Sequence, residues 1–464
     1  MAGTTIVQKP LATTLPVGQE VIYAVSNTDI VPNFTGVKII AEVHISNTIA
    51  PVVSTTTDLI GTFKTIPNNA GVGMFDFRPI IESFVNADNL ARKDSEYKGV
   101  TNVEGSNVPM HLIDKYSGNL NTMRWLAVKF TTQYIDATGA VVIDASSATH
   151  SLKVMNGYLK YSDKLYLVGN NFGYYLDLFE NNGSSTKFLT NSPTTQYANI
   201  DDYGTMGLLM LNPYSIINPS GTVGVVFNFY KEDDTVLGTE DLDHTAANGG
   251  FAYPDNNIYS DLLFLGVYPA NLQNWSTVFN TNIADISYYD FQIVDDAGHA
   301  MSALYTMNIN CPNAKGFEPI RLTWLNQWGA WDYYTFNMKS TKSISTKGST
   351  YHQLGGTWNE ASYRIDSFKG GKKAFRVNAT EKISMNTDFV SESDSEWFEE
   401  LINSPEVYIL EGFKTDAVNS SLNKYVTPVR LLTSNYTKKT VANDKLMQYT
   451  FEVEKTKTLR TQSI

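Results

Sequence analysis

The segment Val37–Ile45, with the sequence VKIIAEVHI, alternates apolar with polar or charged side chains at every position but Ile40. A period of two places one set of side chains on a core face and the other set in solvent, which is the pattern of a β-strand. The same period recurs near the C-terminus over Met447–Glu454. We therefore predict a strand at each place, with His44 among the solvent-facing residues of the first.

Three further segments have the pattern of a strand, a turn and a second strand. Their turns fall at residues 136–139, 231–234 and 295–298, and they contain Asp or Gly. Both residue types supply the backbone angles that a tight reversal needs. The sequence therefore predicts three β-hairpins.

Helical signals are few. The clearest helix is predicted over Glu396–Asn403, where Ser393 and Glu396 have the spacing of a capping box and Pro405 ends the pattern. A second short helix is predicted over Pro79–Val85, because proline suits the first helical turn.

The composition also favours sheet over helix. The chain has 464 residues, of which 42% are hydrophobic and 12% aromatic. Only 18% are charged, against about 25% in an average soluble domain. Aromatic and β-branched residues suit pleated sheets, and this length exceeds one ordinary core. We therefore expect a mainly β fold of two to four β-sandwich-like or β-barrel-like domains with a few short helices.

Polar, turn-rich stretches near residues 150 and 318 give the expected domain boundaries. We predict an N-terminal β-domain over 1–150 and a second β-domain over 151–318. A C-terminal β-domain over 319–464 would hold an aromatic hairpin and one short helix. The segment Lys339–Gly356 is rich in Ser, Thr, Lys and Gly, and we predict an exposed loop or flexible arm there.

Charge and cysteine content narrow the function classes. Acidic residues outnumber basic ones by 47 to 35, a net charge of −12, which disfavours broad binding to nucleic acid. Residues 1–10 lack the pattern of a secretory signal, and the apolar runs are too short to cross a bilayer. The single cysteine, Cys311, excludes an intramolecular disulfide and disfavours a cysteine-based zinc site. We expect synthesis in a reducing cytoplasm and no membrane partner.

Motifs for catalysis are sparse. The six histidines lie more than five residues apart, and none belongs to an H-E-x-x-H pattern. Neither a G-x-S-x-G elbow nor a phosphate-binding loop occurs. The acidic runs at 232–234 and 240–243 would suit calcium or a glycosidase pair, but solvated turns explain them better. We predict no catalytic, cofactor-binding or metal-binding residues and a non-enzymatic protein.

Residues 321–336, with the sequence RLTWLNQWGAWDYYTF, form the densest aromatic block of the chain. We predict a strand over 322–325, a turn over 326–329 with Gly329 at a positive φ, and a strand over 331–336. The block is either the apolar hairpin of one domain or an interface anchor, since Trp, Tyr and Arg dominate protein–protein hot spots. The candidate interface residues are Arg321, Trp324, Asn326, Trp328, Gly329, Trp331, Tyr333 and Tyr334.

This aromatic block resembles the signature R-x-x-W/F-L-N-x-x-G-x-W/Y-D/E-x-x-x-F of virion proteins from tailed phages of Bacteroidota, crAss-like phages among them. The segments Phe75–Val85, Trp397–Tyr408 and Lys445–Glu454 are similar to other stretches of the same group. The resemblance implies a non-enzymatic structural subunit that repeats in a ring or trimer and needs no cofactor. Its sites would be interfaces and not pockets.

On this resemblance we expect a tail ring, hub or adaptor protein of a short-tailed phage, forming part of a cyclic oligomer around the DNA conduit. Its partners would be further copies of itself and other virion tail proteins, with a passing contact with DNA in the lumen. The protein would be assembled in the cytoplasm of the bacterial host and located in the virion tail.

Two alternatives belong to other functional classes. A receptor-binding tail or head fibre protein would recognise a bacterial surface glycan through exposed Tyr and Trp side chains. A polysaccharide-degrading tail enzyme would instead cleave such a glycan with a carboxylate pair.

Overall fold

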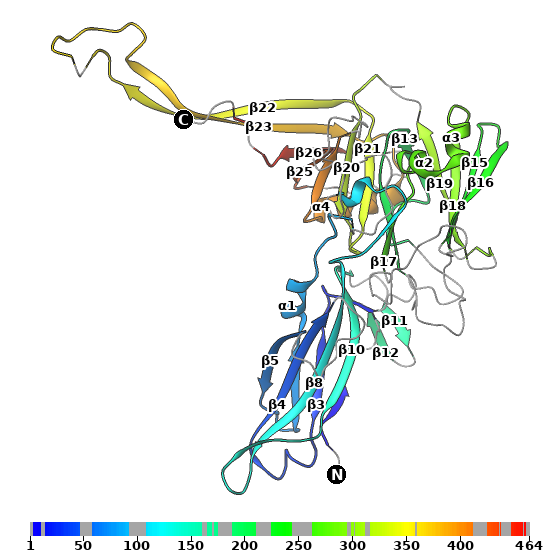
Figure 1. Cartoon of the computed structure of the whole chain (residues 1–464), viewed down its shortest axis with the longest axis vertical. Helices are drawn as coiled ribbons and strands as arrows, with labels where there is room; N and C mark the ends of the chain where they lie inside the picture. Colours follow the sequence, from blue (N-terminus) through cyan, green and yellow to red (C-terminus); the bar gives the residue numbers. More distant parts are fainter. Residues whose placement is uncertain are drawn as a thin grey trace. The chain divides into compact units, whose positions relative to one another are not determined.

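A computed structural model describes most of the chain, and Figure 1 shows its elements. The described residues are 3–10, 14–46, 58–91, 108–159, 165–168, 171–174, 188–209, 224–243, 262–294, 298–300, 302–310, 316–357, 360–411, 425–435, 437, 447–457 and 459–460. Within them the strands form six sheets, accompanied by a few short helices. The prediction of a mainly β fold with several sheets and few helices is confirmed.

The chain divides into two compact units. The first unit contains Met1–Cys311, Leu325–Asp332 and Gly412–Asn423, and the second contains Pro312–Trp324, Tyr333–Glu411 and Lys424–Ile464. The three ranges predicted from the sequence divide the chain differently, because residue 150 falls inside strand β10 (Ala148–Met155). Strand β7 (Tyr116–Gly118) pairs with β17 (Leu262–Gly266), so residues from the first two predicted ranges share one sheet.

The N-terminal part of the first unit is a β-sandwich. One sheet has the order β1 (Thr5–Gln8), β3 (Ile22–Ser26) and β6 (Val72–Asp76). The other has the order β2 (Thr14–Pro16), β10, β8 (Met123–Ile135), β4 (Thr35–Ser46) and β5 (Leu59–Thr65), and β9 (Val141–Ile143) also pairs with β8. Buried side chains of both sheets, including Tyr23, Phe75 and Phe130, pack in one core.

Strand β4 confirms the strand predicted at 37–45. Ile39, Ala41 and Val43 are fully buried, as the alternation requires. His44, which we expected in solvent, is only 2% exposed. The reason is that β4 lies between two other strands, and the register places His44 beside Leu59 of β5 and Ala127 of β8. Burial lowers the pKa of His44, because desolvation disfavours its charged form.

The rest of the first unit holds further sheets and most of the short helices. One sheet has the order β13 (Thr195–Asn199), β19 (Tyr305–Asn310), β18 (Tyr288–Val294), β15 (Gly224–Tyr230) and β16 (Val236–Asp243). Another has the order β14 (Thr205–Leu209), β17 and β7, and β11 (Leu165–Val168) pairs with β12 (Asn171–Tyr174). The helices of this unit include α1 (Arg78–Ile81), α2 (Pro269–Trp275), α3 (Thr277–Asn282) and the 3-10 turns Glu82–Phe84 and Met110–Leu112.

These elements confirm several local predictions. The predicted helix at 79–85 is α1 with the 3-10 turn that follows it. The predicted hairpins with turns at 136–139 and 231–234 are β8–β9 and β15–β16. In the third, β18 pairs with β19, and turn residues 295–297 lie outside the described residues.

The second unit is built on a seven-stranded sheet. Its order is β21 (Trp331–Phe336), β20 (Ile320–Leu325), β24 (Val407–Leu410), β25 (Val426–Leu431), β26 (Thr450–Lys455), β23 (Gly371–Asn386) and β22 (Ser340–Gln353). Helix α4 (Glu392–Asn403) places Trp397, Phe398 and Leu401 in the same core as Trp324 and Phe451. The core of the second unit therefore forms where one face of the sheet meets α4.

Helix α4 begins earlier than predicted. Its N-cap is Ser391, whose Oγ accepts a hydrogen bond from the backbone N of Asp394 at 3.4 Å. The Asp394 carboxylate in turn accepts from the backbone N of Ser391 at 2.8 Å. The predicted capping box of Ser393 and Glu396 is therefore wrong by two residues, because Ser391 and Asp394 offer the same spacing one half-turn upstream.

We predicted an exposed loop or flexible arm at 339–356. Its exposure is confirmed, but the loop is wrong, because residues 340–353 form strand β22, which is paired along its length with β23. Its Ser, Thr, Lys and Gly content is typical of loops, but it reflects a strand that buries little of either face. The sequence pattern that indicates a strand lies in its partner, β23. Phe375–Met385 alternates apolar and polar residues at every position but Glu381.

Removing the cap of α4 should destabilise the second unit. We expect Ser391→Ala to lower the free energy of unfolding by about 1 kcal/mol, because the backbone N–H of Asp394 loses its acceptor. Ser391→Asp should stay near the wild-type value, since Asp caps helices as well as Ser does. Urea denaturation followed by tryptophan fluorescence measures both variants. An equal loss in the two would show that capping is not what this side chain contributes.

Candidate functional site

The aromatic block forms the predicted hairpin, but the turn of this hairpin is buried. Strands β20 and β21 are neighbours in the sheet, and Asn326 N donates to Ala330 O at 2.9 Å across the turn. Gly329 has a φ of 74°, the positive value that we predicted. A Cβ at this position would lie 1.8 Å from the carbonyl O of Asn156. The backbone of Asn156 therefore passes directly against the turn.

The Asn326 side chain holds this turn in shape. Its Oδ1 accepts from the backbone N atoms of Trp328 and Ala330, both at 3.0 Å. Its Nδ2 donates to the carbonyl O of Leu189 at 2.8 Å. One amide thus closes the turn and attaches it to a distant segment of the first unit.

The two residues after the turn are held by polar contacts as well. Trp331 is 1% exposed, and its Nε1 donates to the carbonyl O of Asp88 at 2.9 Å. Its ring meets the His111 ring edge to face, with centroids 4.6 Å apart. The Asp332 carboxylate accepts from Thr190 Oγ1 at 2.7 Å. All these partners belong to the first unit.

The strand residues of the block that belong to the second unit pack inside it. Trp324 is fully buried, with its ring centroid 5.0 Å from that of Trp397. The Arg321 guanidinium lies 5.2 Å from the centre of the Tyr333 ring, a cation–π arrangement. Tyr334 is partly buried, and this burial raises the pKa of its hydroxyl.

Seven of the eight candidate interface residues are thus buried within the described chain, and the eighth, Tyr334, is partly buried. Their side chains pack the cores of the chain itself and leave little surface for another protein. A role for them in contacts between copies stays a prediction. A surface rich in exposed apolar side chains lies in a different place.

That surface is a projecting ribbon, here called the arm, which consists of residues 340–386. At its base β23 also pairs with β26 over Lys382–Asn386, and Ala379 forms a bridge with Leu459. Beyond Ala379 the two arm strands have only each other as strand partners among the described residues. Figure 1 shows the ribbon running out from the sheet of the second unit. From the Thr346–Ala379 pair to the last strand pair the ribbon extends roughly 23 Å.

Exposed apolar side chains concentrate on the arm. It holds about a tenth of the chain but eight of the 25 large hydrophobic side chains that are exposed in the described residues. These eight are Ile344, Tyr351, Leu354, Tyr363, Ile365, Phe368, Phe375 and Val377. Such a concentration typically marks an interaction site. We did not predict this concentration from the sequence. The alternation of apolar and polar residues over Phe375–Met385 would have indicated a strand there.

The acidic runs singled out in the sequence have structural roles. Residues 232–234 lie in the exposed turn between β15 and β16. Glu240 accepts the backbone N–H groups of Thr277 and Val278, each at 3.1 Å, at the start of α3. Within the described ranges, no group of three His, Cys, Asp or Glu side chains is placed to hold a metal ion. Cys311 lies outside those ranges. None of the described helices is long and apolar enough to cross a membrane.

Comparisons with known proteins add no family. No protein-family model matches the chain, and no curated protein sequence matches it either. Among solved structures, the chain is similar to native E. coli alpha-2-macroglobulin, with a TM-score of 0.18 and 10% identity over 82% of this chain and 22% of that one. It is also similar to Salmonella alpha-2-macroglobulin reacted with methylamine, with a TM-score of 0.18 and 8% identity over 96% and 22%. The chain spans about a fifth of the length of these proteins. At such TM-scores neither likeness carries an inference.

A side chain at position 329 should be strongly destabilising. We expect Gly329→Ala to lower the free energy of unfolding by about 3–5 kcal/mol, because it combines an unfavourable positive φ with a clash against the Asn156 carbonyl. Gly139→Ala is the matched control, since Gly139 has a φ of 84° but nothing within 4 Å of its Cβ position. It should cost only about 1–2 kcal/mol. Thermal unfolding of both variants checks this, and equal losses would contradict the buried turn.

Truncating Trp331 should damage the fold itself. We expect Trp331→Ala to cost about 3–5 kcal/mol, because it empties a core site and leaves the Asp88 carbonyl without its donor. The double variant Trp328→Ala, Trp331→Ala should lose the β-sheet circular dichroism signal. Tyr197→Ala, at a side chain that is 65% exposed, should change stability by less than about 0.5 kcal/mol. A well-folded double variant would show that the block is not needed for folding.

Proposed function

We propose that this chain is a non-enzymatic structural subunit of a phage virion, a tail ring, hub or adaptor protein that assembles into a cyclic oligomer around the DNA conduit. The observation that carries this proposal is the arm. A two-stranded ribbon alone is at best marginally stable in water. A ribbon that also exposes eight large apolar side chains gains stability when it lies against another protein.

The outer edge of the arm supports the same proposal. Strand β22 has 14 residues and lies at the end of its sheet. Long exposed edge strands offer unpaired N–H and C=O groups to other chains. A strand from a neighbouring subunit would satisfy these groups by β-augmentation. Because arm and recipient surface differ, the contact is heterologous, and such contacts close into rings when the rotation between subunits permits it.

Charge and sequence resemblance support the phage assignment. The net charge of −12 suits a conduit wall along which DNA slides without adhering. The block at 321–336 resembles virion proteins of tailed phages of Bacteroidota. The proposed partners are further copies of the chain and other tail proteins, with passing contact with DNA. Assembly would take place in the host cytoplasm, and the mature location would be the virion tail.

The oligomeric state tests this proposal. We expect size-exclusion chromatography with light scattering to give a defined oligomer, and purified virions to contain the chain. A variant in which an Asn-Gly turn replaces residues 347–378 joins Thr346 to Ala379, which already face each other. It should be monomeric, with the circular dichroism of a folded β-protein. A wild-type chain that stays monomeric at every concentration and is missing from virions would contradict the proposal.

A further inference from the structure

The tip of the arm, described over residues 354–357 and 360–370, presents apolar side chains to solvent. The exposed fractions are 65% for Leu354, 60% for Tyr363, 80% for Ile365 and 70% for Phe368. Surface loops are ordinarily polar, because an exposed apolar side chain gains nothing from water. Four such side chains within one short tip therefore need a partner surface to explain them.

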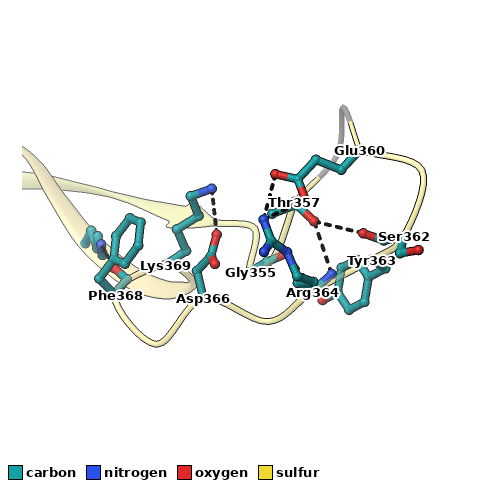
Figure 2. Close-up of polar contacts among 10 residues, drawn as sticks. Gly355, Thr357, Glu360, Ser362, Tyr363, Arg364, Asp366, Phe368 and Lys369 are labelled. Atoms are coloured by element: carbon teal, nitrogen blue, oxygen red, sulfur yellow. Dashed lines mark hydrogen bonds and ion pairs between the residues drawn. The ribbon is translucent and has the colours of Figure 1, made fainter.

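Polar contacts join residues within the tip, as Figure 2 shows. The Arg364 guanidinium pairs with the Glu360 carboxylate at 2.6 Å, and Lys369 pairs with Asp366 at 2.9 Å. The backbone N of Thr357 donates to the carbonyl O of Arg364 at 3.0 Å, and the backbone N of Arg364 donates to Thr357 Oγ1 at 3.1 Å. Each exposed ion pair is weak by itself. Together the contacts give the tip a defined shape, which lowers the entropic cost of binding.

The arm and the remainder of the chain carry opposite charge. Residues 340–386 contain eight Lys and Arg but three Asp and Glu, a net charge of +5. The other 417 residues contain 27 basic and 44 acidic residues, a net charge of −17. Lys347, Lys372 and Arg376 are exposed on the arm strands. The arm is therefore complementary in charge to the rest of its own chain.

From these observations we infer that the arm tip of one copy docks on a second copy of this chain, outside the arm of that copy, where acidic residues outnumber basic ones by 44 to 27. The apolar side chains of the tip supply the contact area, and the basic strands behind them supply attraction and orientation. This inference rests on the proposed function, because it names the partner and the contacting residues of that assembly.

A second copy fits the arm better than a nucleic acid does. The body that carries the arm has a net charge of −17, which opposes the approach of a phosphate backbone. Tyr363, Phe368 and Arg364 of the tip are of the kinds that stack on bases, but Leu354 and Ile365 beside them are aliphatic and would gain nothing from a base. A second copy brings both an excess of acidic residues and a folded protein for the apolar tip to contact.

The test compares tip variants with matched surface variants in the full chain. Ile365→Ser with Phe368→Ser should raise the dissociation constant for self-association by about tenfold or more, because it removes the central apolar contacts. The control pair is Ile66→Ser with Val236→Ser, whose side chains are 73% and 60% exposed outside the arm. These changes should leave the dissociation constant unchanged. Sedimentation equilibrium measures both, and circular dichroism confirms that all variants fold.

Charge reversal tests the electrostatic part. Lys347→Glu with Lys372→Glu should weaken self-association at low salt, and added salt should weaken the wild-type assembly. Lys38→Glu with Lys457→Glu changes the total charge equally at exposed positions outside the arm. This pair should have a smaller effect. If both pairs act equally, total charge and not the arm controls association, which overturns the inference.

Cross-linking identifies what the tip touches. Benzoylphenylalanine at position 368, in a mixture of isotopically heavy and light chains, should give heavy–light cross-links to segments outside 340–386. Cross-links confined to arm–arm contacts, or nucleic acid retained by the wild type and lost on charge reversal, would overturn the inference. A wild-type oligomer whose tip variants assemble equally well removes this inference alone. A wild type that never assembles and is absent from virions removes the proposed function with it.

Discussion

The buried turn at Asn326–Ala330 constrains the structure tightly, because the Asn326 side chain, Gly329 and the carbonyl of Asn156 are packed against one another there. Asn326 uses three hydrogen bonds to shape and attach the turn. The carbonyl O of Asn156 lies so close to Gly329 that no side chain would fit at position 329. Directly after the turn, the buried Trp331 contacts Asp88 and His111. The turn residues of the hairpin belong to the first unit, and most of its strand residues belong to the second.

Two carboxylates of the first unit show how ionisable groups support this architecture. The Asp88 carboxylate accepts the backbone N–H groups of Leu120, Asn121 and Thr122 at 2.6–3.2 Å, and burial raises its pKa. Glu240 does the same for the first turn of α3. Each carboxylate is occupied by backbone donors that would otherwise be unsatisfied. Polar side chains used in this way stabilise loops and helix ends. A protein built from many short strands has many such loops, whose backbone N–H groups need acceptors.

The arm differs from the cores in where its apolar side chains lie. In the cores, apolar side chains of adjacent strands meet inside the chain, whereas on the arm they face outward. Near its base the core face of β23 continues directly into the arm, because Ile383 and Met385 are buried while Val377, on the same alternation, is exposed. One strand thus passes from a core to a surface that no other described residues of the chain cover.

Local sequence pattern correctly predicted the mainly β fold, the strand at 37–45, the hairpins and the positive φ of Gly329. The strand predicted at 447–454 forms as β26 over Thr450–Lys455, and Met447 takes part only in a bridge with Val390. These follow from side-chain period and turn chemistry, which act over a few residues. Only the tertiary structure shows that His44 is buried, that β22 is a strand, and that the side chains of the aromatic block are buried or partly buried. Each of these depends on which distant segment lies alongside, such as Leu59 and Ala127 for His44, Phe375–Met385 for β22, and Asn156 for Gly329. Pairing across such separations is selected by the packing of the whole chain, and a local pattern does not contain it.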